Sequence, residues 1–149
     1  MDGPRVILRD LLDPAAPLPG ALPEGIAASG DLSVDVRTLE HDHRRVGPGT
    51  WFACIRGARA DGHTFAPAAV AAGAVALLVD RPTGLGVPEV AVGDVRTALG
   101  PLAARLAGDP SHAVRCLGVT GTNGKTTVTY LLHAIATAAP RAPGRRHRR

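Results

Sequence analysis

The chain has 149 residues, which is enough for one domain, or for one domain and the beginning of another. It is 45% hydrophobic but holds one Trp, one Tyr and two Phe, so its core must use small aliphatic side chains, and the composition favours α/β layers over a disordered chain. The formal net charge of +4 comes from residues 141–149, which contain five Arg and no acid, so the nearly neutral remainder does not indicate a nucleic-acid-binding body.

The pattern along the chain predicts alternating strands and helices. Residues 1–30 are rich in Pro and Gly and contain one short helical candidate, Val6–Leu12. The elements predicted after it are strands Val34–Leu39 and Trp51–Ile55, helix Phe65–Ala72, strands Ala74–Val79 and Val87–Val92, helix Val95–Leu106, strand Val114–Val119 and a helix from Lys125 to about Ala138. This order predicts an α/β fold with a mostly parallel sheet.

A domain boundary is predicted near Asp109, because no acidic residue follows it. The strand, loop and helix after this point cannot bury both faces of a sheet by themselves. We therefore expect them to be the first unit of a domain whose remainder is missing.

Cysteine and histidine positions do not indicate a metal site. Cys54 and Cys116 are far apart in sequence, and reduced buried thiols are expected. His41, His43 and His63 have no carboxylate or cysteine at metal-site spacing, so solvated loop histidines are expected. No apolar run reaches the ~18 residues of a membrane helix, and the first residues contain no apolar signal-peptide core. A cytoplasmic protein is expected.

The segment Gly121-Thr122-Asn123-Gly124-Lys125-Thr126 predicts a phosphate-binding loop between a strand and a helix. Its glycines permit backbone angles at which successive N–H groups face an anion, and the helix N-terminus favours negative charge. Lys125 is predicted to reach the β- and γ-phosphates of ATP, and the Thr126 hydroxyl to bind Mg²⁺. Thr122 and Thr127 can add hydroxyl contacts.

The alternative for this loop is a glycine-rich turn with an incidental lysine. The general phosphate-loop pattern has Gly five positions before the second glycine, where this chain has Val119. Against the alternative, Lys125 is the single Lys among sixteen Arg and Asn123 is the single Asn. A compact ammonium is not interchangeable with a guanidinium beside a phosphate.

Three segments together resemble the Mur ligases, the family that builds the peptide stem of peptidoglycan. Gly118–Thr127 is similar to the family's ATP loop, and Asp42–Ala53 to its D-S-R-x-V-x-P-G-D-L-F-V/A segment. Gly57–Phe65 with Ala68–Val79 is similar to its G-x-x-x-D-G-H-x-F…A-x-x-x-G-A-x-A-x-L-V stretch. The resemblance covers about residues 34–139, and the loop most resembles the MurE type; the alternative is another type, such as MurF.

The resemblance implies a domain organisation and an activity. Residues 1–109 would form the N-terminal domain that binds the UDP substrate, 110–139 the start of the central ATP-binding domain, and 140–149 a basic disordered tail. The activity would be an ATP- and Mg²⁺-dependent ligation that adds a diamino acid, diaminopimelate or lysine, to UDP-N-acetylmuramoyl-L-alanyl-D-glutamate. The competing interpretation is a non-catalytic fragment that binds a nucleotide or UDP-sugar. The oligomeric state stays open, and a membrane or RNA partner is not favoured.

The resemblance also implies particular site residues. Lys125 would be catalytic, Gly121 to Thr127 would bind ATP, and Thr126 would bind the metal. The UDP end of the substrate would be held by two loops, through Asp42, His43, Arg44, Asp61, Gly62 and His63. His43 replaces the family's Ser, which puts a UDP contact there in question. The alternative for both loops is surface turns shaped by Gly, Pro and Asp.

Overall fold

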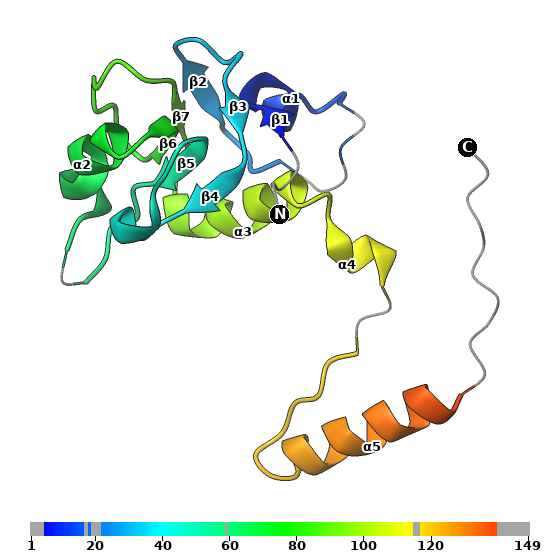
Figure 1. Cartoon of the computed structure of the whole chain (residues 1–149). Coiled ribbons are helices and arrows are strands. Elements are labelled where there is room, and N and C mark those ends of the chain that lie inside the picture. Colours follow the sequence, from blue (N-terminus) through cyan, green and yellow to red (C-terminus); the bar gives the residue numbers. More distant parts are fainter. Residues whose placement is uncertain (1–4, 17, 19–21, 59, 115–116, 140–149) are drawn as a thin grey trace. The chain divides into compact units, whose positions relative to one another are not determined.

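The computed structural model describes residues 5–16, 18, 22–58, 60–114 and 117–139 (Figure 1). The chain forms two compact units, divided between Ala113 and Val114. The predicted boundary near Asp109 falls just before helix α4 (Pro110–Ala113), which belongs to the first unit. The predicted tail at 140–149 lies outside the described residues, and the assignment of functions to the domains remains a prediction.

The first unit is built on a five-stranded sheet with the order β2-β7-β6-β5-β4. These strands are β2 (Ala27–Ser29), β4 (Thr38–Glu40), β5 (Thr50–Ala53), β6 (Ala74–Val79) and β7 (Glu89–Ala91). Strands β4 to β7 pair in parallel, and β2 joins the edge antiparallel to β7. The predicted α/β fold with a mostly parallel sheet is confirmed.

Two helices, α2 (Ala66–Ala71) and α3 (Val95–Leu106), bury opposite faces of this sheet (Figure 1). In β5, Trp51 packs in the cluster that contains α3 side chains, whereas its neighbour Phe52 packs in the cluster that contains those of α2. Successive strand residues point to opposite faces, so a continuous apolar run is the pattern of a strand covered on both sides.

The N-terminal segment is joined to α3 by a buried arginine. Strand β1 (Val6–Ile7) pairs with β3 (Asp35–Val36), and α1 (Leu8–Leu12) follows β1. Arg105 of α3 is 2% exposed. Its side chain donates to the main-chain oxygens of Leu11 at 2.8 Å, Asp13 at 2.5 Å and Leu18 at 3.0 Å. A buried guanidinium is tolerated because its donors are satisfied in this way.

The second unit contains helix α5 (Lys125–Ala138), which begins at the predicted residue. A strand was predicted over 114–119, but Val114 and residues 117–119 are not in a strand. Residues 115–116 lie outside the described ranges. A strand needs a hydrogen-bonding neighbour, and the described part of this unit contains no second strand. Among the described helices, none combines the length and the apolar character needed to cross a membrane.

Other predictions for the first unit need smaller corrections. The strand predicted over Val34–Leu39 is two strands, β3 and β4, which belong to different sheets. Strand β2 was not predicted. Cys54 is a buried free thiol, as expected, and burial raises its pKa to about 12. Cys116 lies outside the described residues.

The Arg105 contacts generate a stability prediction. Arg105→Met should lower the free energy of unfolding by about 2–4 kcal/mol, because the buried Leu11 oxygen and two partly buried main-chain oxygens lose their donor. Urea denaturation can be followed by the fluorescence of Trp51, the single and fully buried tryptophan. The control is Arg9→Met at an exposed position of α1, which should change the midpoint little. Equal midpoints for the two variants would show that the Arg105 contacts to the N-terminal segment do not stabilise the fold.

Candidate functional site

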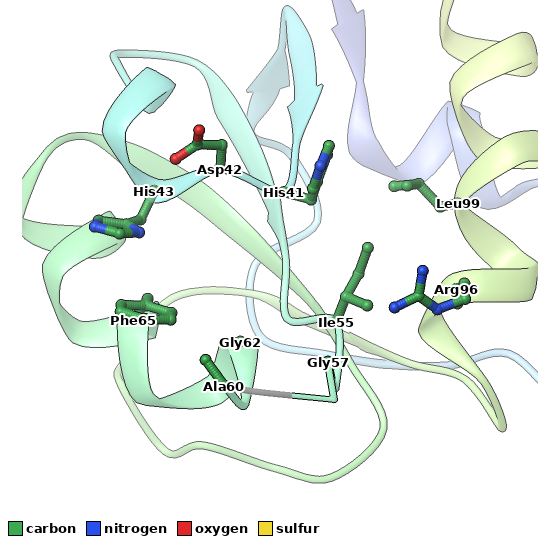
Figure 2. Close-up of a pocket in the computed structure, with 10 residues that line it drawn as sticks. All are labelled: His41, Asp42, His43, Ile55, Gly57, Ala60, Gly62, Phe65, Arg96 and Leu99. Atoms are coloured by element: carbon green, nitrogen blue, oxygen red, sulfur yellow. The ribbon is translucent and has the colours of Figure 1, made fainter.

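The carboxyl ends of the parallel strands surround a cavity of about 520 Å³. His41, Asp42 and His43 follow β4, and Ile55, Gly57, Ala60 and Gly62 follow β5. Phe65 immediately precedes α2, and Arg96 and Leu99 belong to α3, which follows β7 (Figure 2). Ligands of open α/β sheets bind outside the carboxyl ends of the strands, so the cavity lies where the topology favours a site.

The first predicted loop forms a tight turn at this cavity. The Asp42 carboxylate caps the 3₁₀ turn His43–Arg45 by accepting from the Arg44 main-chain N–H at 3.1 Å. It also accepts from the Arg44 side chain, at 2.9 Å from Nε and 2.7 Å from Nη2. These bonds hold the pKa of Asp42 well below its usual range, with the Arg44 side chain the largest cause. The Arg44 guanidinium is already bound to Asp42, and Arg44 is not among the cavity-lining residues.

His43 lines the cavity together with Phe65. Their rings are stacked, with centroids 4.4 Å apart and an angle of 1° between the planes (Figure 2). The imidazole that replaces the family's Ser is therefore fixed against an aromatic side chain. It supplies a flat surface at this end of the cavity, where a serine would supply a small hydroxyl group.

Gly62 brings the second predicted loop against the end of β5. Its N–H donates to the Ile55 oxygen at 2.9 Å. A Cβ at this position would lie 2.6 Å from the Ile55 nitrogen, closer than any real contact. Glycine is thus required for the loop to close on the strand.

Asp61 and His63, on either side of Gly62, fasten this loop and are not among the cavity-lining residues. Asp61 accepts from the His63 main-chain N–H at 3.0 Å, lies 2.9 Å from His63 Nδ1, and accepts from Arg81 Nη2. These interactions hold the pKa of Asp61 below its usual range, the His63 main-chain N–H first and Arg81 second. The His63 side chain is 8% exposed, with Nε2 3.3 Å from Asp80 Oδ1, although the geometry is not that of a hydrogen bond. The prediction of a solvated histidine is wrong for His63.

The predicted substrate residues therefore divide into two groups. Asp42, His43 and Gly62 line the cavity, whereas Arg44, Asp61 and His63 hold the loops in place. Several lining residues were not predicted as site residues, and Arg96, Leu99 and His41 are among them. Arg96 had a sequence signal, because it lies just after a predicted strand, in the first turn of the next predicted helix.

The predicted ATP residues form a separate loop in the second unit. Gly121 and Gly124 have φ of +147° and +77°, values that favour glycine, and Gly124 immediately precedes α5. Lys125 Nζ lies over the loop and donates to the Gly121 oxygen at 2.5 Å. Thr126 and Lys125 line a second cavity of about 470 Å³ with Thr129, Tyr130 and His133. Free N–H groups of a helix N-terminus, an ammonium and a hydroxyl are the donors that a nucleotide phosphate requires.

Together, the carboxyl-edge cavity and the loop before α5 define part of an α/β ligand-binding protein. Residues 35–106 match the Mur ligase family, catalytic domain. The UDP-N-acetylmuramoyl-L-alanyl-D-glutamate--2,6-diaminopimelate ligase of Geobacillus thermodenitrificans is 46% identical over 110 residues, which are 74% of this chain and 22% of the relative. The same-named ligase of Geobacillus kaustophilus is 48% identical over 102 residues, 68% of this chain and 21% of that relative. These matches confirm the predicted resemblance to the Mur ligase family and, within it, to the MurE type.

Solved structures agree with the resemblance to Mur ligases. A crystal structure of MurF from Acinetobacter baumannii superposes with a TM-score of 0.63 at 25% identity, over 94% of this chain and 29% of that one. MurF ligase from Thermotoga maritima, solved in complex with ADP, gives 0.54 at 29% identity, over 68% of this chain and 23% of that one. The chain spans about a fifth of the length of the curated relatives it matches.

The Asp61 network generates a pH-dependent stability prediction. Since the pKa of Asp61 is lower in the folded state than the ordinary value near 4, its carboxylate stabilises the fold at neutral pH, and this contribution is lost as the pH falls below about 4. Asp61→Asn should therefore lower the urea midpoint at pH 7, and the difference from wild type should shrink at pH 3. Asp10→Asn, at an exposed position of α1, is the control. A difference of the same size at both pH values would show that the ionised Asp61 carboxylate does not stabilise the fold.

Proposed function

We propose that the chain is part of an ATP-dependent amide-forming ligase of peptidoglycan precursor synthesis. The ligase adds a diamino acid to UDP-N-acetylmuramoyl-L-alanyl-D-glutamate, and it acts in the cytoplasm. The observation that supports this most is the identity of 46–48% to two diaminopimelate-adding ligases. Both of these curated relatives carry the same name, which favours this type over the MurF type, whereas solved structures of the two types match at similar identities, 23% and 25–29%.

The first unit would bind the UDP end of the substrate in the carboxyl-edge cavity. Its volume of about 520 Å³ is within the range of small-molecule sites. The stacked His43 and Phe65 would contact the planar base, and the turn capped by Asp42 would fix the position of these rings. Gly62 would keep the second loop close enough to contact the ligand through its main chain.

The loop at 121–127 would hold the phosphates of ATP. Lys125 would move from the Gly121 oxygen to the β- and γ-phosphate oxygens, and Thr126 would provide a hydroxyl ligand for Mg²⁺. When bound, ATP supplies the phosphoryl group that activates the substrate carboxylate for attack by the amine. The residues of the chain bind and orient the phosphates and stabilise their charge.

Substrate binding by the first unit can be tested on the 149-residue chain. On addition of UDP-N-acetylmuramoyl-L-alanyl-D-glutamate, NMR signals of residues 41–43 and 57–62 should shift, because these loops line the cavity. Signals of α1, which contributes no residue to the lining, serve as the internal control. Shifts confined to residues 121–126 would mean that the cavity does not bind this substrate.

The ATP loop can be tested in a chimera in which residues 5–139 replace the matching part of the Geobacillus thermodenitrificans ligase. The chimera should release phosphate in a diaminopimelate-dependent reaction, and Lys125→Ala should reduce turnover by at least about 100-fold, since a charge-stabilising group is lost. Thr137→Ala, near the other end of α5, is the control and should retain activity. Equal turnover of the Lys125→Ala and parent chimeras would refute the assignment of Lys125.

The 149-residue chain alone should show no turnover, because no acidic residue follows the loop to provide a second metal ligand.

A further inference from the structure

Arg96 is a cavity-lining cation that no motif pointed to. It lies in the first turn of α3, after the carboxyl end of β7, and its main-chain N–H donates to the capping carboxylate of Asp94 at 2.9 Å. Figure 2 shows its guanidinium extending from α3 toward Ile55, on the side of the cavity opposite the His43–Phe65 stack. The cavity thus has an aromatic end and a cationic end.

The other described arginines near this edge of the sheet are already paired with acids. Arg44 binds Asp42 at 2.7 Å, Arg45 lies 3.2 Å from Glu40, and Arg56 lies 3.6 Å from Asp80. Arg81 is paired with both Asp61 and Asp80. Among the described residues, Arg96 has no carboxylate within ion-pair distance, although its charge contributes last to the lowered pKa of Asp94, after the bonds from Thr97 and the Arg96 main chain.

One lining residue carries a formal charge that is not paired, and that charge is positive. Asp42 is the single acidic residue of the lining, and its carboxylate is bound by Arg44. His41 and His43 add imidazole groups, and Arg96 adds a guanidinium free to make two parallel bonds. An unpaired guanidinium in a concave site is suited to phosphate oxygens, which accept bidentate bonds.

We propose that Arg96 binds the diphosphate of a uridine nucleotide in the carboxyl-edge cavity. This inference rests on the substrate-binding function proposed above and assigns the phosphate contact to α3 instead of to Arg44. The base then lies toward the His43–Phe65 stack, and the diphosphate lies toward Arg96. The part of the substrate beyond the diphosphate leaves the cavity on the Arg96 side.

The test measures binding of UDP, uridine and ADP to the 149-residue chain by titration calorimetry and NMR. Wild type should bind UDP about tenfold or more tightly than uridine, since a charged hydrogen bond contributes this much. Arg96→Gln should bind UDP and uridine equally, and the salt dependence of UDP binding should weaken. Arg96→Lys should recover part of the difference, because it keeps the charge without the planar fork. Arg9→Gln, which removes the same charge from an exposed position of α1, should match wild type.

Each alternative outcome separates the two proposals. If wild type binds uridine and UDP equally in the cavity, or if Arg96→Gln binds UDP like wild type, Arg96 is not the phosphate ligand and the substrate site still stands. If ADP shifts the cavity signals as strongly as UDP, the assignment to a uridine nucleotide is wrong. If neither uridine nor UDP shifts the NMR signals of residues 41–43 or 57–62, the proposed substrate-binding function is wrong as well. Circular dichroism of Arg96→Gln should match wild type, because the side chain is exposed and has no ion pair among the described residues.

Discussion

The burial of β5 and β6 on both faces is the constraint on which the rest of the first unit depends. Neither face of these strands can hold a charged side chain without a large desolvation cost, so their residues are apolar or small. Polar residues are therefore displaced to the strand ends, and parallel pairing brings the carboxyl ends of β4 to β7 to one edge. The cavity at that edge follows from the sheet, and its chemistry depends on the loops.

Most charged side chains of the loops at this edge are paired with nearby charged side chains. Asp42 with Arg44, and Asp61 with Arg81 and His63, form local networks whose bonds rigidify the turns. A motif that is rich in charged residues therefore need not present those charges to a ligand. In this chain the motif residues build the walls of the cavity, and the unpaired cation comes from Arg96, which lies outside both motifs. Rigid walls also reduce the ordering cost of binding, because fewer side chains must be immobilised.

The sequence predicted the elements whose signals are local. Strand β6 and helices α3 and α5 begin at the predicted residues, because apolar periodicity and a terminating Gly or a capping Asp act within a few residues. Strand β2 has no such signal, since its three residues are exposed and it exists by pairing with β7, far along the chain. The burial of His63 is likewise non-local, because Asp80 and Arg81 arrive from the end of β6. The lining position of Arg96 depends on sheet order, which periodicity does not specify.

The two proposed sites differ in what holds them. The cavity is lined by residues from three stretches of one packed unit, so its geometry is maintained by that unit's core. The phosphate loop takes its shape from Gly121, Gly124 and the Lys125 contact, all within five residues. Helix α5 meanwhile exposes Leu131 and Ile135, by 59% and 64%, and isolated helices of this length are marginal in water. The shape of the loop is therefore encoded locally, but its affinity for phosphate depends on whatever packs against α5, because an N-terminal anion site requires the helix to stay formed.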